Sequence, residues 1–276
     1  MAAGRNRIGS GEATSLSKAL AILRLVAARN VSGIKLTDVG RQTGLATTTT
    51  HRLMHALTDE AFLSFDPYSK RYFLGTDAAA LGAASGWGAL SQDLRHPLQT
   101  ALEKVAKRTG DTTYLSVRQE MSAVCVGKAP GSFAVSANTL DLGARRPLGV
   151  GAGSLVLLAA ETPEAAERII SRNSEVYERY GRLTAEHVRA AIAAARRENY
   201  TFNDSLIIEG VGAIGVPVYD PRRTAGDALV GAISVAAISS RLRSERRQEI
   251  CAEIRKILAE LNLSDKGEDL AADTLF

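Results

Sequence analysis

The chain has 276 residues, of which 45% are hydrophobic and 23% charged, and a formal net charge of +4. These values are ordinary for a globular protein, and the length favours two domains. No apolar run approaches the roughly 18 residues that a membrane-spanning helix needs. The two cysteines, Cys125 and Cys251, form neither a disulfide framework nor a metal-binding pattern. The N-terminus lacks an apolar secretory segment, so we expect a cytoplasmic protein without membrane contact.

Positive charge is concentrated in the first quarter of the chain. Residues 1–75 contain ten lysines and arginines against five acidic residues, a balance of +5, whereas the remainder contains 24 against 25. Such an excess is a weak indication of nucleic-acid binding, because positive charge attracts phosphate groups.

The first elements in chain order are two helices. Residues 1–14 are rich in Gly, Arg and Ser, and we expect a disordered tail there. From Leu16 onward apolar residues recur at helical spacing, with Ser15 as the expected N-cap. After a break at NVSG, a second short helix begins near Thr37. We expect it to end at Gly44, because glycine accepts the positive φ of a helix C-terminus.

A third helix and a hairpin complete the first domain. The helix is predicted over about residues 47–58, and its apolar face carries Ala46, Thr50, Leu53 and Leu57. The next segment, FLSFDPYSKRYFLG, alternates like two short strands, with the turn between them at 67–70. Three helices followed by a hairpin is the order of a winged helix-turn-helix, which we assign to residues 15–76.

The rest of the chain is predicted to form a linker helix and a second domain. Small residues dominate after Gly75, and we assign residues 77–95 to the linker helix and 96–276 to the second domain. The predicted strands are 112–119, 122–128, 133–143, and further strands within 201–220 and 228–239. The predicted helices are about 151–172, 184–199 and a closing amphipathic helix over 240–263. Strands separated from helices indicate an α+β domain with an antiparallel sheet.

Four threonines, Thr47 to Thr50, begin the third helix, although threonine is a poor helix former. At the start of a recognition helix, threonine hydroxyls can donate to DNA phosphates and the methyls can pack against thymine methyls. Thr47 then caps the helix, and Thr50 faces its core. The expected DNA-binding residues are Thr47, Thr48, Thr49, His51, Arg52 and His55 of the helix, with Lys70 and Arg71 of the wing. An ordinary capped helix with a threonine-rich first turn is the alternative.

Residues 15–75 resemble the DNA-binding domain of the IclR family of bacterial transcriptional regulators. The family's GL-P-x-[ST]-T-x-x-R-L-L run is matched by Gly44, Leu45, Thr48, Thr49, Arg52 and Leu53, and its Y-x-L-G ending is matched by residues 72–75. The chain departs from the family at Ala46, where proline is usual, at Thr47, where a basic residue is frequent, and at Gly40, where alanine is commoner. At Thr47 the chain lacks the basic side chain that makes the family's usual phosphate contact.

The resemblance continues through the segments GARRPLGVGAGSLVLLAA, ENYTFNDSLIIEGVGAIGVPVYD and ALVGAISVAAIS, and so spans roughly residues 15–263. It implies that the second domain is a GAF-like effector-binding domain and that the protein is a homodimer or homotetramer. Carried over position by position, the family's pattern implies an effector site at Val135, Ala152, Gly153, Ser154, Asn203, Ala213, Ser234 and Ala236.

The chemistry of these positions suits an acid. A helix that starts near Gly151 offers free backbone N–H groups, which bind carboxylates. Ser234, with Asn203 or Asp204, can add directional hydrogen bonds in a largely apolar cavity. Four departures from the family's usual polar residues, at Leu155, Ser205, Leu206 and Ala236, predict a less polar pocket that takes a larger or more apolar acid, such as an aromatic one. Alternatively, the glycines of GVGAG serve only close packing of a helix on the sheet.

The leading hypothesis is a transcriptional regulator, repressor or activator, whose binding to a pseudo-palindromic operator in double-stranded DNA is tuned by a small organic acid. No cofactor and no bound metal are expected. The alternative is a metabolic enzyme or ligand-binding module based on the C-terminal domain, with the N-terminal domain as an oligomerisation element. The sequence shows no Ser/His/Asp order, metal cluster or phosphate-binding G-x-x-x-x-G-K-[ST] motif, which argues against the enzyme.

Overall fold

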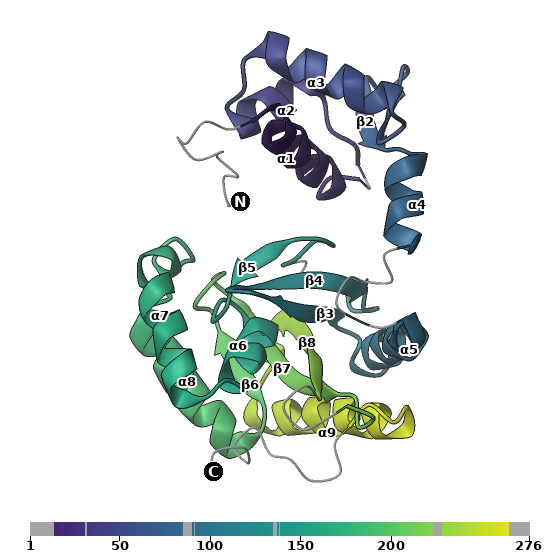
Figure 1. The fold of residues 1–276 in the computed structure, drawn as a ribbon. Coiled ribbons are helices and arrows are strands. Elements are labelled where there is room, and N and C mark those ends of the chain that lie inside the picture. Colours follow the sequence, from purple (N-terminus) through teal and green to yellow (C-terminus); the bar gives the residue numbers. More distant parts are fainter. Residues whose placement is uncertain are drawn as a thin grey trace. The chain divides into compact units, whose positions relative to one another are not determined.

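The structure is a computed structural model that describes residues 14–30, 32–84, 90, 92–134, 137, 139–223 and 228–264. The chain divides into two compact units, Met1–Gly88 and Ala89–Phe276 (Figure 1). Of the predicted tail over residues 1–14, only Thr14 lies within the described residues. The domain limits proposed from the sequence, at 76 and 95, stay predictions. Helix α4 (Thr76–Ala84) occupies the first half of the predicted linker helix.

The N-terminal unit is a winged helix-turn-helix, as predicted. Its elements are α1 (Ser15–Ala27), α2 (Leu36–Thr43), α3 (Thr47–Asp59), β1 (Leu63–Asp66) and β2 (Arg71–Leu74). The three helices and the hairpin share one apolar core, built from Ile22, Val26, Ile34, Val39, Leu53, Met54 and Leu63. Strands β1 and β2 pair antiparallel, with Leu63 opposite Leu74 and Asp66 opposite Arg71.

Two of the three expected helix-terminal residues differ in the structure. Gly44 ends α2 with φ +74°, as predicted. The N-cap of α1 is Thr14 rather than Ser15, since the Thr14 side chain accepts from Ser17 N at 3.2 Å. Thr47 is not the N-cap of α3, because Ala46 takes the extended backbone of that position and Thr47 is the first helical residue. No side chain caps α3, so its first N–H groups stay available to other acceptors.

The C-terminal unit is built on a six-stranded antiparallel sheet in the order β5-β4-β3-β8-β7-β6. Its strands are β3 (Thr112–Gln119), β4 (Ser122–Ala129), β5 (Arg145–Pro147), β6 (Thr201–Asp204), β7 (Val211–Tyr219) and β8 (Leu229–Ile238). Its helices are α5 (Gln92–Thr109), α6 (Ala152–Ala159), α7 (Pro163–Tyr177), α8 (Ala185–Glu198) and α9 (Ser244–Glu260). The sheet is curled, with α6 on one face and α5 and α9 packed together against the other (Figure 1). The predicted α+β fold with a GAF-like domain is confirmed.

Two predicted elements of this unit are wrong. The helix expected over 151–172 is two helices, because Thr162 caps a new one and Pro163 occupies its first position, where proline is favoured. The described residues within 133–143 form no strand. Tyr114 instead holds two of the described residues, since its hydroxyl donates to Ala137 O at 3.1 Å and accepts from Thr139 N at 3.0 Å. The strand in this region is β5, which begins after the turn at Gly143.

Tyr177 of α7 stabilises the turn that leads from β5 into α6. Its buried hydroxyl donates to Leu148 O at 2.7 Å. The same hydroxyl lies close to Gly149, where a Cβ would come within 2.7 Å of the Tyr177 hydroxyl oxygen. We expect Tyr177→Phe to lower the free energy of unfolding by about 1 kcal/mol, the usual net value of a hydrogen bond. Urea denaturation measures this change. Tyr180→Phe is the matched control, because Tyr180 packs on the same core and its hydroxyl has no hydrogen bond among the described residues; equal losses in both variants would contradict the prediction.

Candidate functional site

One face of α3 carries most of the residues predicted to contact DNA. Successive helical residues are about 100° apart, and the buried side of α3 is formed by Thr50, Leu53 and Met54. The opposite side is exposed and displays Thr47, Thr48, His51, Arg52 and His55. Thr49 lies at the border between the two sides and is half-buried. The helix therefore presents five of its six predicted residues together.

This face is suited to an anion. None of the described residues forms an ion pair or side-chain hydrogen bond with Arg52, which is exposed. The uncapped N-terminus of α3 adds free N–H groups and the positive end of the helix dipole. His55 is partly engaged, because its Nδ1 lies 2.9 Å from Asp59 Oδ2. Thr50 has its own structural task, since its hydroxyl donates to Ala46 O at 3.1 Å inside the unit.

The hairpin between β1 and β2 places the two predicted wing residues differently. Lys70 is exposed in the turn, with φ +57°. Arg71 is half-buried, and its Nη1 donates to Gly33 O at 2.9 Å, which ties the wing to the segment before α2. Sequence reasoning missed Tyr68, whose side chain is 96% exposed at the tip of the same turn. An aromatic residue inside a predicted turn, two positions before a lysine, was the available signal.

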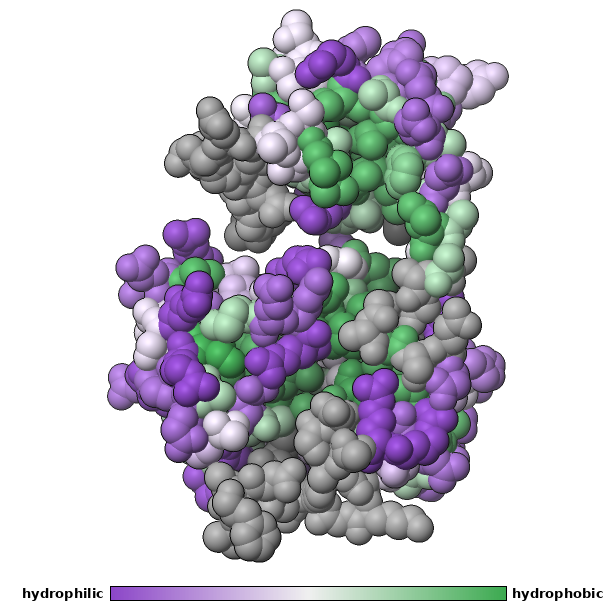
Figure 2. Space-filling view, viewed as in Figure 1, coloured by the Kyte–Doolittle hydropathy of each residue, from purple (hydrophilic) through white to green (hydrophobic). Residues whose placement is uncertain are grey.

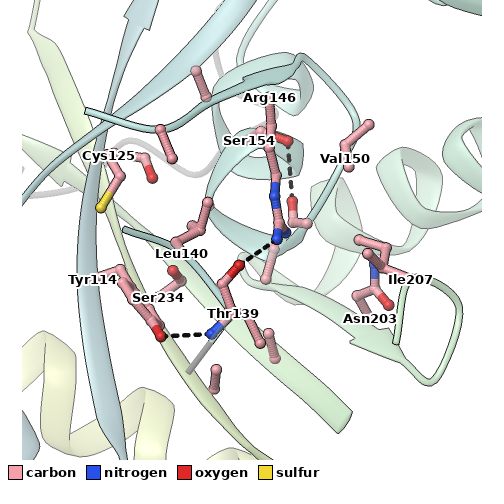
Figure 3. Close-up of a pocket in the computed structure, with 18 of the residues that line it drawn as sticks. Tyr114, Cys125, Thr139, Leu140, Arg146, Val150, Ser154, Asn203, Ile207 and Ser234 are labelled. Carbon is pink, nitrogen blue, oxygen red and sulfur yellow. Dashed lines mark hydrogen bonds between the residues drawn. The ribbon is translucent and has the colours of Figure 1, made fainter. Parts of the chain in front are cut away.

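The C-terminal unit contains a cavity between the start of α6 and the sheet face that α6 covers. It encloses about 600 Å³ of empty space, its open mouth included. Seven of the eight predicted effector residues line it: Ala152, Gly153, Ser154, Asn203, Ala213, Ser234 and Ala236. Val135, the eighth, lies outside the described residues. Figure 3 shows the side chains that surround this space.

Glycines bring α6 close to the sheet and also form part of the cavity wall. A Cβ on Gly215 of β7 would come within 2.6 Å of Ala152 O, so this position requires glycine. A Cβ on Gly153 would meet the hydroxyls of Ser116 and Ser234 at 3.2 and 3.3 Å. The close-packing role considered from the sequence therefore holds. It is compatible with a binding role, because the first residues of α6, Ala152 to Ser154, also line the cavity.

Three of the four residues from which a less polar pocket was predicted lie outside the cavity lining. Leu155 is buried in the core between α6 and the neighbouring helices, and it does not line the cavity. Neither Ser205 nor Leu206 lines it, and the Ser205 hydroxyl lies 3.0 Å from that of Ser239. Only Ala236, of the four departures from the family, faces the space. Ser154 also contributes less than expected, because its hydroxyl donates back to Gly151 O at 3.1 Å.

Arg146 is the main cavity residue that sequence reasoning missed. It is half-buried, and its Nη2 donates to Thr139 O at 2.6 Å (Figure 3). Desolvation lowers the pKa of its guanidinium from the usual value. No carboxylate among the described residues pairs with it. The RRP triplet was a usable signal, since side chains alternate along a strand and only one of two adjacent arginines can point inward.

Cys125 also lines the cavity, whereas Cys251 lies in α9. Desolvation raises the pKa of each buried thiol to about 12. At pH 8 both stay protonated, and only the thiolate is nucleophilic. We expect iodoacetamide to modify neither cysteine of the folded protein within an hour at pH 8, and to modify both in guanidinium chloride. Mass spectrometry measures the added mass, and rapid modification of the folded protein would contradict the assignment.

Family models match most of the chain. The model of the IclR helix-turn-helix domain matches residues 15–67, and the model described as the bacterial transcriptional regulator IclR C-terminal domain matches residues 89–262. The transcriptional repressor IclR of Escherichia coli is 22% identical over 94% of this chain and 92% of its own length. A glycerol operon regulatory protein of Streptomyces griseus is 28% identical over 83% of this chain and 86% of its own.

Solved structures share the fold. An IclR transcriptional regulator from Alicyclobacillus acidocaldarius, 23% identical, aligns with a TM-score of 0.68 over 90% of this chain and 97% of its own. An IclR homolog from Microbacterium hydrocarbonoxydans, 22% identical and solved in complex with 4-hydroxybenzoate, aligns with a TM-score of 0.64 over 90% of this chain and 100% of its own. Within the described ranges, no helix has both the length and the apolar character that crossing a bilayer requires.

The family matches decide between the hypotheses drawn from the sequence. The matched family and its curated relatives are DNA-binding regulators of transcription, not enzymes, and both units of the chain match. The chain belongs to the IclR family of bacterial transcriptional regulators.

Proposed function

We propose that a small organic acid binds in the cavity of the C-terminal unit and thereby changes the affinity of the protein for its operator. The observation that carries this proposal is the cavity itself, which gathers seven residues that the family's pattern had implied. The first residues of α6 line it, and the free N–H groups at a helix start favour a carboxylate. The solved homolog with 4-hydroxybenzoate supports an aromatic acid as the effector. Such control requires that the acid bind the two DNA-binding states unequally.

Isothermal titration with a matched pair of ligands tests the effector. We expect 4-hydroxybenzoate to bind and 4-hydroxybenzamide, which has the same shape but no charge, to bind at least about tenfold more weakly. The acid is then added to a complex of the protein with DNA from upstream of its own gene, and the affinity is measured again. Equal binding of acid and amide would contradict a carboxylate site, and an acid that binds without altering operator affinity would contradict control.

For the N-terminal unit, we propose that the exposed face of α3 enters the major groove and that the wing contacts the adjacent backbone. The arrangement of Thr47, Thr48, His51 and Arg52 on one side of the helix supports this. Two such helices on half-sites one or more helical turns apart would read a pseudo-palindromic operator. This requires a homodimer, or a tetramer made of two dimers. We therefore also propose a cytoplasmic location, where chromosomal DNA is accessible.

An exposed apolar stripe on α1 supports self-association. Leu16 is 68% exposed and Leu20 39%, and the half-buried Leu23 continues the same side of the helix. Figure 2 shows apolar side chains gathered on the N-terminal unit in this region. Exposed leucines in a row are typical of protein contacts. We propose that a second copy of the chain covers them.

The pair of substitutions Leu16→Lys and Leu20→Lys is expected to convert the dimer of the full chain into a monomer. Like charges would then face each other across the contact, while the exposed positions leave the core intact. Light scattering after size exclusion measures the mass. Leu142→Lys, at a leucine that is 54% exposed in the C-terminal unit, is the control and should leave this contact intact. An unchanged mass in the double variant would exclude α1 as the dimer contact.

A further inference from the structure

The exposed face of α3 ends in a carboxylate. Residues four, seven and eleven positions apart on a helix lie within about 60° of one another around its axis, because successive residues are about 100° apart. Thr48, Arg52, His55 and Asp59 have this spacing, and all four are exposed, so they form one line along the surface proposed to meet DNA. The last of them is acidic, and phosphate groups repel negative charge. Whatever offsets the charge of Asp59 therefore affects DNA binding.

His55 is the residue that contacts Asp59. Its Nδ1 lies 2.9 Å from Asp59 Oδ2, and the two side chains are 68% and 63% exposed. An ionised carboxylate only accepts hydrogen bonds, so Nδ1 carries a proton and donates it. The other ring nitrogen, Nε2, then decides the charge of the pair. With Nε2 unprotonated the pair carries one negative charge, and with Nε2 protonated the pair is neutral.

The charged groups beside the His55 ring lie on α3 itself. The ring of His51 is 6.1 Å away between centroids, and Arg52 adds positive charge on the same face, whereas Asp59 adds negative charge. The main elements packed against α3 are α1, α2 and β1. No hydrogen bond or ion pair joins His55 to the charged residues that the structure describes in these elements, which are Lys18, Arg24, Asp38, Arg41 and Asp66.

The position of His55 along α3 favours a phosphate over a base. The N-terminal residues of a recognition helix contact base edges, and residues further along such a helix can contact the backbone. His55 lies about two turns after Thr47, which is about 12 Å along the axis. A phosphate oxygen accepts hydrogen bonds and so requires a donor. Because Nδ1 is already held by Asp59, His55 supplies that donor only when Nε2 is protonated.

We infer that operator binding is linked to the uptake of a proton at His55, whose protonated Nε2 donates to a DNA phosphate while Asp59 orients the ring. This inference rests on the proposed entry of α3 into the major groove and adds a dependence on pH to it. The proton is taken from the solvent. Because the protonated form binds DNA more tightly, operator affinity is highest at low pH and falls as the pH rises through the range in which histidine loses its charge. His55 makes the contact, and Asp59 is a positioning residue.

Fluorescence anisotropy with the full chain and labelled DNA from upstream of its own gene, at constant ionic strength, tests the inference. We expect the parent protein to bind at least about tenfold more tightly at about pH 6 than at about pH 8, since a dimer has two such sites. In His55→Gln most of this difference should disappear, because glutamine gains no proton. Asp59→Asn should bind about threefold or more tightly than the parent at about pH 8, because the repelled charge is gone, and its affinity should fall at a lower pH.

Proton uptake is also measured directly, by titration calorimetry in phosphate and Tris buffers, which differ in ionisation enthalpy. We expect the parent protein to take up as much as about one proton per subunit on binding DNA, and His55→Gln to take up clearly less. His187→Gln is the matched control. His187 is exposed in the first turn of α8 in the C-terminal unit, and its loss should leave both the pH dependence and the proton uptake intact.

The outcomes separate this inference from the proposed function. His55 and Asp59 are both more than half exposed, so their substitution leaves the core of the N-terminal unit intact. Tight DNA binding with the same pH dependence in the parent and in His55→Gln would overturn the inference and leave the proposed function standing. Loss of the dependence in His51→Gln alone would assign the proton to His51 and overturn it as well. Failure of the parent protein to bind this DNA at any pH would overturn both.

Discussion

Replacing Arg52 with alanine is expected to weaken operator binding by at least about 30-fold. Arg52 is exposed on the α3 face, and none of the described residues pairs with it, so its guanidinium is available to a base edge or a phosphate. One arginine contact of this kind is worth about 1–3 kcal/mol, and a dimer makes it twice. Fluorescence anisotropy with labelled operator DNA, at two salt concentrations, measures the loss. If Arg52 contacts phosphate, the salt dependence should also become shallower.

The control for this experiment is Arg168→Ala. Arg168 is exposed on α7 in the C-terminal unit, and its loss changes the net charge by the same amount as the loss of Arg52. It should leave operator affinity within about twofold, because charges beyond a Debye length of roughly 10 Å are largely screened. Equal losses in the two variants would show that the contribution of Arg52 is one of net charge alone. Unchanged binding in Arg52→Ala would remove the α3 face from the interface.

The N-terminal unit could be predicted from sequence because its signals are local. Gly44 marks the end of α2 through the positive φ it adopts, and the spacing of Thr50 and Leu53 defines the buried side of α3. Each of these signals acts within a few residues. The error at Thr47 has the same local scale, since threonine favours the N-cap in general but Ala46 takes that position here.

The cavity was predictable in its position but not in its electrostatics. The family's pattern picked out seven residues that line one cavity, because it marks the start of α6 and the strands beneath it. Arg146 was missed because its significance depends on contacts far away in sequence, where Gly151 leaves it room and no carboxylate among the described residues reaches it. The error at Ala137 and Thr139, which were expected in a strand, has a similar reason. A hydroxyl on Tyr114, more than twenty residues earlier, bonds to both of them.

Filling the cavity is expected to weaken acid binding and to abolish its effect on operator affinity. Operator binding in the absence of acid should remain. Ala213 lies on the cavity floor and is half-buried, so the three extra carbons of Ala213→Leu would occupy space that a ligand needs. Forcing a ligand against them costs up to about 3 kcal/mol, which corresponds to an affinity loss of about 100-fold. The α3 face lies in the other compact unit and is unchanged. Operator binding in the absence of acid should therefore be the same as in the parent protein.

Ala190→Leu is the matched control, since it makes the same change at an exposed position of α8 outside the cavity. It should leave both acid binding and its effect on operator affinity intact. Thermodynamic linkage adds a further check, because an acid that changes operator affinity by some factor must have its own affinity changed by the operator by the same factor. In Ala213→Leu both factors should approach one together. If the variant still responds to the acid as the parent does, the effector binds elsewhere than in this cavity.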